Sequence, residues 1–216
     1  MNLGDVRYSD NRKNQAPLFT QKVFTRFTGF YMSDESGSTD AVKITSPAIH
    51  DIFRNLYINE DRNRMIIKDI LDAHSEGREC LVLSERLEHL NILGDALKEH
   101  ASSLFMLKGG LGKKQVKAIM EAIQNTAPHE HRIILATGKY LGEGFDLPSL
   151  DTLFLVFPFS WKGMLVQYTG RLNRSFHGKR EVRVYDYVDE REPVLAGMYR
   201  KRLKGYRALG FIVNMP

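Results

Sequence analysis

The chain has little cysteine and no long hydrophobic segment. Its 216 residues include a single cysteine, Cys80, so no disulfide can form within the chain. Cys80 lies in the apolar run CLVL and is expected to be a buried strand residue. No apolar run approaches the roughly 20 residues of a membrane span, and the first residues, MNLGD, lack the hydrophobic stretch of a signal peptide. These absences favour a cytoplasmic protein with no membrane partner.

A complete phosphate-binding P-loop is also missing. The run KGGLGKK at 108–114 looks like one, but the pattern GxxxxGK followed by Ser or Thr fails at two positions, where Leu107 and Lys114 stand. A metal site is not expected either, because His129 and His131 lack the i, i+4 spacing of a zinc-binding helix. We therefore expect the isolated chain not to hydrolyse a nucleoside triphosphate.

The composition is that of a basic globular protein. Hydrophobic residues make up 43% of the chain, which is enough for a sizeable core, and the length fits one domain or a domain and a half. The formal net charge is +5, with an isoelectric point near 9.2. This balance suits a polyanionic partner without proving one.

Apolar runs alternate with amphipathic segments from residue 80 onward. Strands are expected at 80–83, 103–107, 132–136, 152–156 and 182–187, with helices between them, a basic helix across 191–209 and a last strand at 211–213. Before residue 80, the pattern predicts a strand at 23–28, a helix starting with Ser46 as its cap, and a helix capped by Asn59 that ends at Gly77. Continuous apolar strands alternating with helices predict an α/β fold with a mostly parallel sheet covered on both faces.

Two runs about twenty residues apart carry the functional signal. Residues 136–148 are ATGKYLGEGFDLP, a strand end followed by a glycine-rich loop and an acid, and residues 167–174 are QYTGRLNR. Arg171 and Arg174 lie three apart, on one face of a helix, where guanidinium groups can clamp phosphate. Read alone, the second run could also be an ordinary amphipathic helix with two solvated arginines.

Together the two runs resemble motifs V and VI of the superfamily 2 helicases and translocases. The resemblance implies a RecA-like three-layer domain, the second of two such lobes. It assigns arginine-finger roles to Arg171 and Arg174, and Gln167, one turn earlier, would orient a phosphate or a water. Gly144 and Asp146 would lie at the nucleotide, with Asp146 facing its ribose or the arginines. Asp146 alternatively caps a turn before Pro148.

A third run, LVLSERLEHL at 81–90, resembles motif IV of the same proteins. Ser84 and Arg86 at a helix N-terminus suit a nucleic-acid phosphate. The alternative is an ordinary cap, with Ser84 bonded to the backbone and Arg86 in water. By the same resemblance, Gly109 and Gly110 would lie beside the nucleic acid and Thr137 would contact its backbone.

The resemblance also implies what the chain works with. Residues 1–21 would connect it to a first RecA-like ATPase lobe, which would hold most of the ATP and Mg, and residues 22–216 would form the C-terminal domain. DNA is favoured over RNA, because Glu143 stands where many DEAD-box RNA helicases carry arginine. The alternative function is a non-catalytic adaptor that binds nucleic acid or a partner ATPase.

Overall fold

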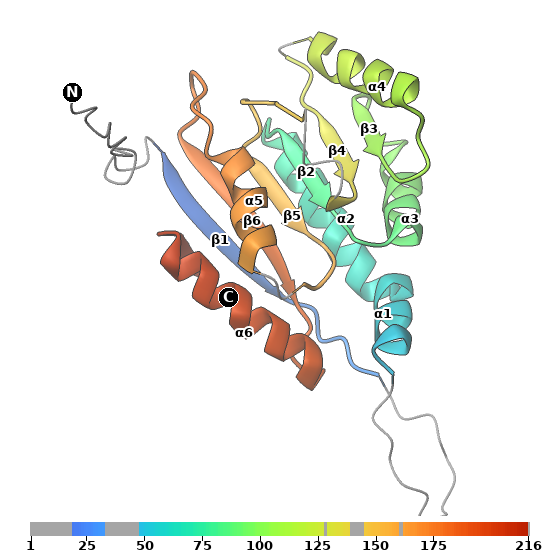
Figure 1. Cartoon of the computed structure of the whole chain (residues 1–216), viewed down its shortest axis with the longest axis vertical. Helices are drawn as coiled ribbons and strands as arrows, with labels where there is room; N and C mark the ends of the chain where they lie inside the picture. The colour runs from blue at the N-terminus through green and yellow to red at the C-terminus, as the bar shows by residue number, and fades with distance from the viewer. Residues whose placement is uncertain (1–18, 33–47, 128, 139–144, 160–161, 216) are drawn as a thin grey trace, which may run out of the picture.

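The strands of the chain form one parallel sheet. The computed structural model describes residues 19–32, 48–127, 129–138, 145–159 and 162–215, and within them the sheet has the strand order β3-β4-β2-β5-β6-β1-β7 (Figure 1). Every neighbouring pair in that sheet is parallel. The strands are β1 (Thr20–Phe27), β2 (Cys80–Leu83), β3 (Leu104–Leu107), β4 (Ile133–Ala136), β5 (Thr152–Leu155), β6 (Glu181–Val188) and β7 (Ile212–Asn214). The predicted fold class is confirmed.

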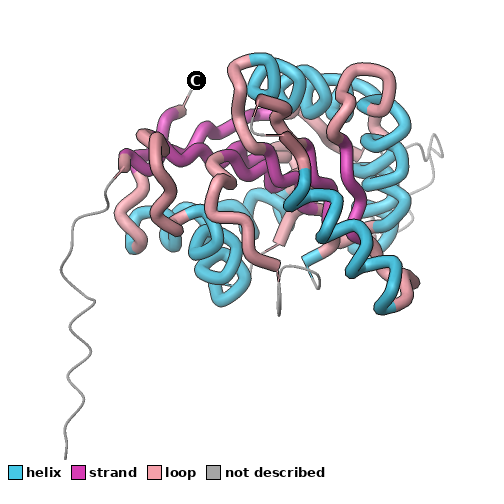
Figure 2. Tube along the Cα trace, turned by 90° about the horizontal axis from the view of Figure 1, so that it is seen from above, coloured by secondary structure: helices cyan, strands magenta, loops and turns pink. Residues whose placement is uncertain are grey.

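Helices cover both faces of this sheet, as Figure 2 shows from above. Leu81 and Leu83 of β2 point into a core shared with α4, α5 and α6. Cys80 and Val82, the alternate residues, point into a core shared with α2 and α3, so the prediction of a buried Cys80 is confirmed. This alternation gives the predicted three layers. The helices are α1 (Ile49–Ile58), α2 (Glu60–Ser75), α3 (Leu87–Leu97), α4 (Lys113–Asn125), α5 (Lys162–Leu172) and α6 (Pro193–Ala208).

The predicted boundaries of α2 are confirmed. Asn59 caps α2, accepting a bond from the Arg62 amide at 2.9 Å, and Gly77 ends that region with a φ of 79°. Among the boundaries that differ are the starts of β1 and α1. β1 begins at Thr20, three residues before its predicted start, because Phe19 and Gln21 are already buried. Helix α1 begins at Ile49 with Ala48 as its cap, so the prediction that Ser46 caps it is wrong.

A third, smaller core lies where α1 meets the end of the sheet. It contains Phe30, Ile52, Leu56, Phe157 and Leu195, with Phe53 packed against it. Beside it, the fully buried Arg62 of α2 pairs with Asp189, the residue after β6, at 2.9 Å. A buried pair of this kind does little for net stability but is costly to break. It therefore fixes α2 relative to β6.

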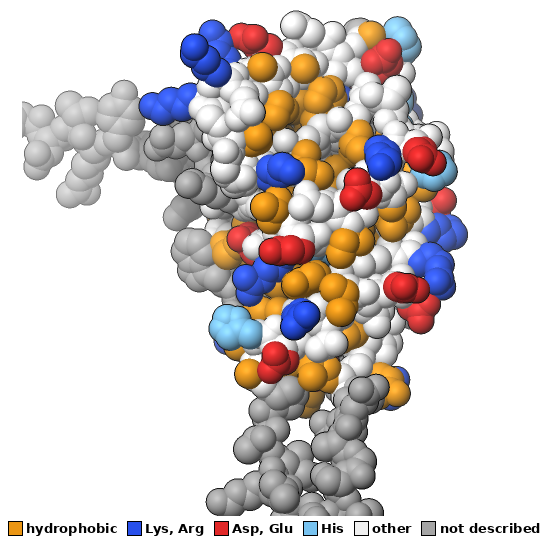
Figure 3. All heavy atoms as spheres, turned by 90° about the vertical axis from the view of Figure 1, so that its right-hand side faces the viewer, with side chains coloured by type: hydrophobic (Ala, Val, Ile, Leu, Met, Phe, Trp, Pro, Cys, Tyr) orange, Lys and Arg blue, Asp and Glu red, His pale blue; other side chains and the backbone are white. Residues whose placement is uncertain are grey.

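The surface at the β3 edge of the sheet carries mixed charge. Figure 3 shows acidic and basic side chains interspersed with hydrophobic ones on that face, with no gathering of lysine and arginine. The net positive charge of the chain is therefore not concentrated there. Among the described residues, no helix is long and apolar enough to cross a membrane.

Candidate functional site

The predicted nucleic-acid contacts converge on one edge of the sheet. Leu83 of β2 and Leu107 of β3 both pair with Ala136 of β4, which lies between them, so the three strands end in register. Residues immediately after parallel strands lie at the same edge. The candidates that follow these strand ends are Ser84, Arg86, Gly109, Gly110 and Thr137. Segments far apart in the sequence thus form one carboxyl-terminal edge.

The Ser84 hydroxyl points inward at this edge. Its side chain is buried, and Oγ accepts a bond from the Arg86 amide at 3.2 Å. The same oxygen lies 3.2 Å from Nδ1 of His89, whose Nε2 lies 3.0 Å from Oδ1 of Asn63. The Asn63 oxygen can only accept, so His89 Nε2 donates to it and Nδ1 accepts from Ser84. Burial and nearby Arg62 hold the pKa of His89 well below its usual range, so the ring stays neutral.

This chain of bonds shapes the turn that presents Arg86. The backbone bond of the alternative interpretation is observed, because the Ser84 hydroxyl is bonded to the Arg86 amide and also to His89. Ser84 is nevertheless not the cap of α3, since the N-cap position is occupied by Arg86. A contact between Ser84 and nucleic acid stays a prediction. Sequence reasoning gave no role to Asn63 or His89, since nothing local shows that a histidine in α3 faces an asparagine in α2.

Arg86 packs against two aromatic rings, those of Phe53 and Phe157, which together are called its aromatic seat. Its guanidinium carbon lies 5.6 Å from the ring centres of both Phe53 and Phe157. These two rings pack against each other, with centres 4.9 Å apart. Cation–π contacts of this kind hold a charged side chain in place while leaving its N–H groups free to bind an anion. The Arg86 side chain is half-buried, and the two rings hold its guanidinium in position. It is therefore not the fully solvated arginine of the alternative interpretation.

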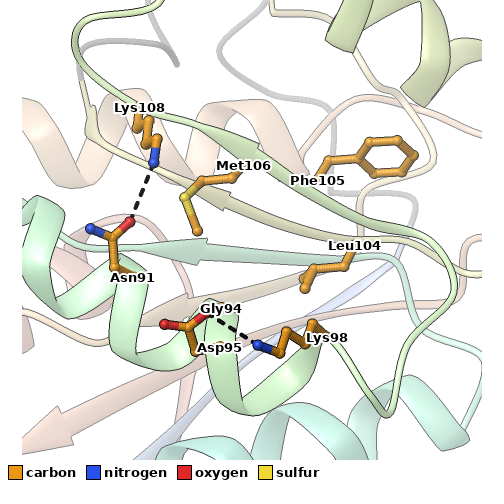
Figure 4. Close-up of a pocket in the computed structure, with 8 residues that line it drawn as sticks. All are labelled: Asn91, Gly94, Asp95, Lys98, Leu104, Phe105, Met106 and Lys108. Atoms are coloured by element: carbon orange, nitrogen blue, oxygen red, sulfur yellow. Dashed lines mark hydrogen bonds and ion pairs between the residues drawn. The ribbon is translucent and has the colours of Figure 1, made fainter.

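The glycine turn after β3 is exposed. Gly110 has a φ of 88°, a conformation that favours glycine, and the turn leads into α4 at Lys113. Lys108 Nζ reaches Asn91 of α3 at 3.4 Å across a pocket of about 420 Å³ between α3 and β3 (Figure 4). Asp95 and Lys98 face each other in the same pocket. The exposed glycines leave room for a chain to pass close to the backbone.

The two arginines of the 167–174 run reach back to the glycine-loop segment. Arg171 Nη1 donates to the carbonyl oxygen of Phe145 at 2.8 Å, and Arg174 forms an ion pair with Asp146. Of the proposed roles of Asp146, facing the arginines is the one observed. Gln167 is exposed on α5, one turn before Arg171. Gly144, predicted to lie at the nucleotide, is outside the described residues, as is Glu143.

Lys179 fixes the end of α5. Its ammonium donates to the carbonyl oxygens of Pro148 at 2.6 Å, Leu172 at 3.0 Å and Arg174 at 3.0 Å. Burial lowers the pKa of Lys179 to about 8, so the amine keeps its proton at neutral pH. The carbonyls at a helix C-terminus need donors, and a cation there is favourable. Sequence reasoning missed Lys179, because only the fold brings it to this helix end.

Residues 62–175 match the family model of the helicase conserved C-terminal domain. The chain belongs to this family.

The chain is also similar to curated proteins and to solved structures. The transcript termination protein A18 of fowlpox virus is 25% identical over 130 residues, which cover 59% of this chain and 27% of that protein. The structure of T4 UvsW superposes with a TM-score of 0.65 at 17% identity, over 92% of this chain and 41% of that one. Domain 2 of the DEAD-box helicase Mss116p, solved bound to an RNA duplex, has a TM-score of 0.54 at 12% identity, over 92% and 64% of the two chains. This chain therefore spans about a quarter of the fowlpox protein.

The parallel sheet extends beyond the range that the family model matches. The predicted site residues all lie within 62–175, whereas β1, α1, β6, α6 and β7 lie outside it. The three strands among these elements complete the sheet, in the order β6-β1-β7. Phe53, on α1, also lies outside the range, so the aromatic seat of Arg86 is formed partly by an element that the family model does not include.

Proposed function

We propose that this chain is the second RecA-like lobe of a superfamily 2 helicase or translocase that couples nucleoside triphosphate hydrolysis to movement on nucleic acid. The observation that carries the proposal is the placement of Arg171 and Arg174. Arg171 lies in the last turn of α5 and Arg174 lies two residues beyond the end of that helix, and their guanidinium groups contact the adjacent residues Phe145 and Asp146. Two guanidiniums held together in this way suit the charge on a transferring phosphoryl group.

In this proposal the nucleotide is held mainly by another lobe. The sequence has no P-loop lysine motif, so ATP and Mg would bind to a first RecA-like lobe, and this chain would add Arg171, Arg174, Gln167 and Asp146 to the closed cleft. ATP supplies the phosphoryl group that is transferred to water. The residues of this chain contribute charge and orientation to that step. Closure and reopening of the two lobes would drive movement.

The carboxyl-terminal edge would form part of the nucleic-acid track. Arg86 on its aromatic seat, the exposed Gly109 and Gly110, and Thr137 lie side by side there. These groups are one charged side chain, exposed backbone and a hydroxyl. They are suited to binding phosphates, and they do not distinguish one base from another. DNA is the favoured substrate because Glu143 stands where many RNA helicases have arginine.

Two measurements test the proposal. The isolated chain should release no phosphate from ATP, with or without nucleic acid, whereas the complete enzyme, in which the chain is joined to its ATPase lobe, should be stimulated by DNA. The isolated chain should bind duplex DNA weakly, and about two phosphate contacts would lower its affinity roughly 10-fold between 50 and 200 mM salt. RNA of the same sequence is the comparison. Turnover by the isolated chain, or binding indifferent to salt, would overturn the proposal.

The alternative function, a non-catalytic adaptor, predicts a different outcome for the same variants. It predicts that removing Arg171 or Arg174 weakens nucleic-acid binding and leaves turnover of the complete enzyme intact. The lobe proposal predicts the reverse, so one pair of variants separates the two functions.

A further inference from the structure

One hydrogen bond joins the two groups of site residues. Tyr168 lies on α5 between Gln167 and Arg171, and its hydroxyl donates to Oε1 of Glu85 at 3.0 Å. Glu85 lies between Ser84 and Arg86, in the turn after β2. The bond therefore connects the helix of the arginines to the turn of the proposed nucleic-acid contact, across 83 residues of sequence.

The bond passes directly over the backbone of Gly138. A Cβ atom at that position would lie 2.1 Å from the Tyr168 hydroxyl oxygen and 2.5 Å from Oε1 of Glu85. Side-chain carbons do not approach other atoms that closely, so only glycine leaves the space that the bond occupies. Gly138 follows Thr137, another predicted nucleic-acid contact. Three segments from different parts of the sequence thus meet at one point.

The Tyr168 ring is held firmly at this point. It is 3% exposed and packs edge-on against Phe159, with ring centres 5.8 Å apart. Burial, together with the nearby Glu85 carboxylate, raises the pKa of Tyr168, so its hydroxyl stays protonated and remains a donor. Glu85 itself is exposed. A rigid donor on the arginine helix is therefore bonded to a carboxylate that solvent and ligands can reach.

We propose that Tyr168 is a positioning residue that couples nucleic-acid binding at the Arg86 turn to the arginine helix α5. The coupling rests on the proposed function. A phosphate bound by Arg86 brings negative charge next to Glu85, and like charges repel, so the Tyr168–Glu85 bond differs between the free and bound states. Any such difference is transmitted to α5, which carries Arg171 and leads directly to Arg174. By linkage, nucleotide at the arginines affects nucleic-acid affinity in return.

The test measures how strongly nucleic acid stimulates ATP turnover in the complete enzyme. The variants are Tyr168→Phe, Glu85→Ala and the double variant, and the quantity compared is the ratio of stimulated to basal turnover. We expect each single variant to lower this ratio about 2- to 10-fold, the range of one ordinary hydrogen bond. The double variant should lower it no further, because both changes remove the same bond. Glu85→Gln keeps an acceptor and should restore part of the ratio.

A matched control removes a different tyrosine hydroxyl. Tyr199 of α6 shares a buried bond of 3.1 Å with Thr25, so Tyr199→Phe makes the same chemical change away from the Glu85 turn and should keep the wild-type ratio. An unchanged ratio in Tyr168→Phe, or additive effects of the two single variants, would overturn the coupling while leaving the proposed function in place. A wild-type enzyme that nucleic acid does not stimulate would instead overturn the proposed function, and the coupling with it.

Discussion

The guanidinium of Arg174 forms an ion pair with the carboxylate of Asp146, while Arg171 bonds the carbonyl of the preceding residue, Phe145. The Arg174 and Asp146 side chains are 43% and 52% exposed, and exposed pairs of this kind contribute at most about 1 kcal/mol. A nucleotide phosphate offers stronger, charge-assisted and bidentate bonds. Under the proposed function, we infer that Asp146 holds Arg174 close to where the phosphate would bind, and that Arg174 exchanges Asp146 for the phosphate when the nucleotide enters the cleft.

Removing either arginine should therefore affect hydrolysis far more than binding. In the complete enzyme we expect Arg171→Ala or Arg174→Ala to lower ATP turnover by about 10³-fold or more, the scale of a lost arginine finger. Steady-state phosphate release, with DNA affinity measured in parallel, checks this. The control is Arg64→Ala, which removes an exposed arginine of α2 on the opposite side of the sheet. Full turnover without DNA binding would make the adaptor the better interpretation.

Arg86 should show the opposite pattern, because it lies at the carboxyl-terminal edge. We expect Arg86→Ala to weaken nucleic-acid binding uniformly across sequences and to reduce the slope of log affinity against log salt by about one. Fluorescence titration of labelled DNA at several salt concentrations measures both quantities. Arg64→Ala again serves as the matched charge control. A variant with the wild-type salt slope would show that Arg86 contacts no phosphate.

The aromatic seat should matter for the same measurement. Phe53→Leu keeps the apolar volume in the small core around α1 but removes one ring from the Arg86 guanidinium. We expect a loss of affinity smaller than that of Arg86→Ala, because the charge remains and only its placement is lost. The salt slope should stay at the wild-type value. A reduced slope would mean that Arg86 no longer reaches the phosphate at all.

The sequence predicts the sheet and its helices well, because those elements are set by local patterns. The run CLVL is buried on both faces, and Asn59 caps its helix. The prediction that Arg171 and Arg174 share one face of a helix is wrong, because α5 ends at Leu172 and Arg174 lies in the bend that follows. The fine structure of the site depends on contacts that the chain makes only after folding. Nothing near Arg86 indicates that Phe53, 33 positions earlier and on another helix, packs against its guanidinium.

Buried polar groups were the least predictable part of the molecule. The 191–209 segment was predicted as a basic helix, and α6 is observed there, but Arg202 is buried, with two bonds to Asp186 of β6 at 2.8 and 2.9 Å. Likewise, nothing in the sequence indicates that the Ser84 hydroxyl is bonded to His89. Charge pattern alone does not distinguish a solvated arginine from a paired one.

His89 should make the stability of the domain sensitive to acid. Its pKa is well below the usual value in the folded state, so between that pKa and about 6.5 only the unfolded chain binds the proton. Stability is then highest above pH 6.5 and falls as the pH drops, by up to about 1.4 kcal/mol per pH unit. We expect His89→Gln to be less stable at pH 7, having lost bonds to Ser84 and Asn63, and to lose less stability on acidification. Urea unfolding at pH 7, 6 and 5 checks both, with the exposed His177→Gln as control.

Lys179 should stabilise the C-terminal end of α5 and so raise the free energy of unfolding. Its ammonium satisfies three backbone carbonyls, two of them from Leu172 and Arg174 at the end of the arginine run. Lys179→Met keeps the length of the side chain but leaves those carbonyls without this donor, and hydrogen bonds from a charged group contribute about 1.5–3 kcal/mol each at most. Because Lys179 is partly exposed and water can replace some bonds, we expect a loss of about 2 kcal/mol in the free energy of unfolding. Lys201→Met, an exposed lysine of α6, is the matched control for urea unfolding. If Lys179→Met were as stable as that control, Lys179 would not be fixing the helix end, and the position of Arg171 and Arg174 would have to depend on Phe145 and Asp146 alone.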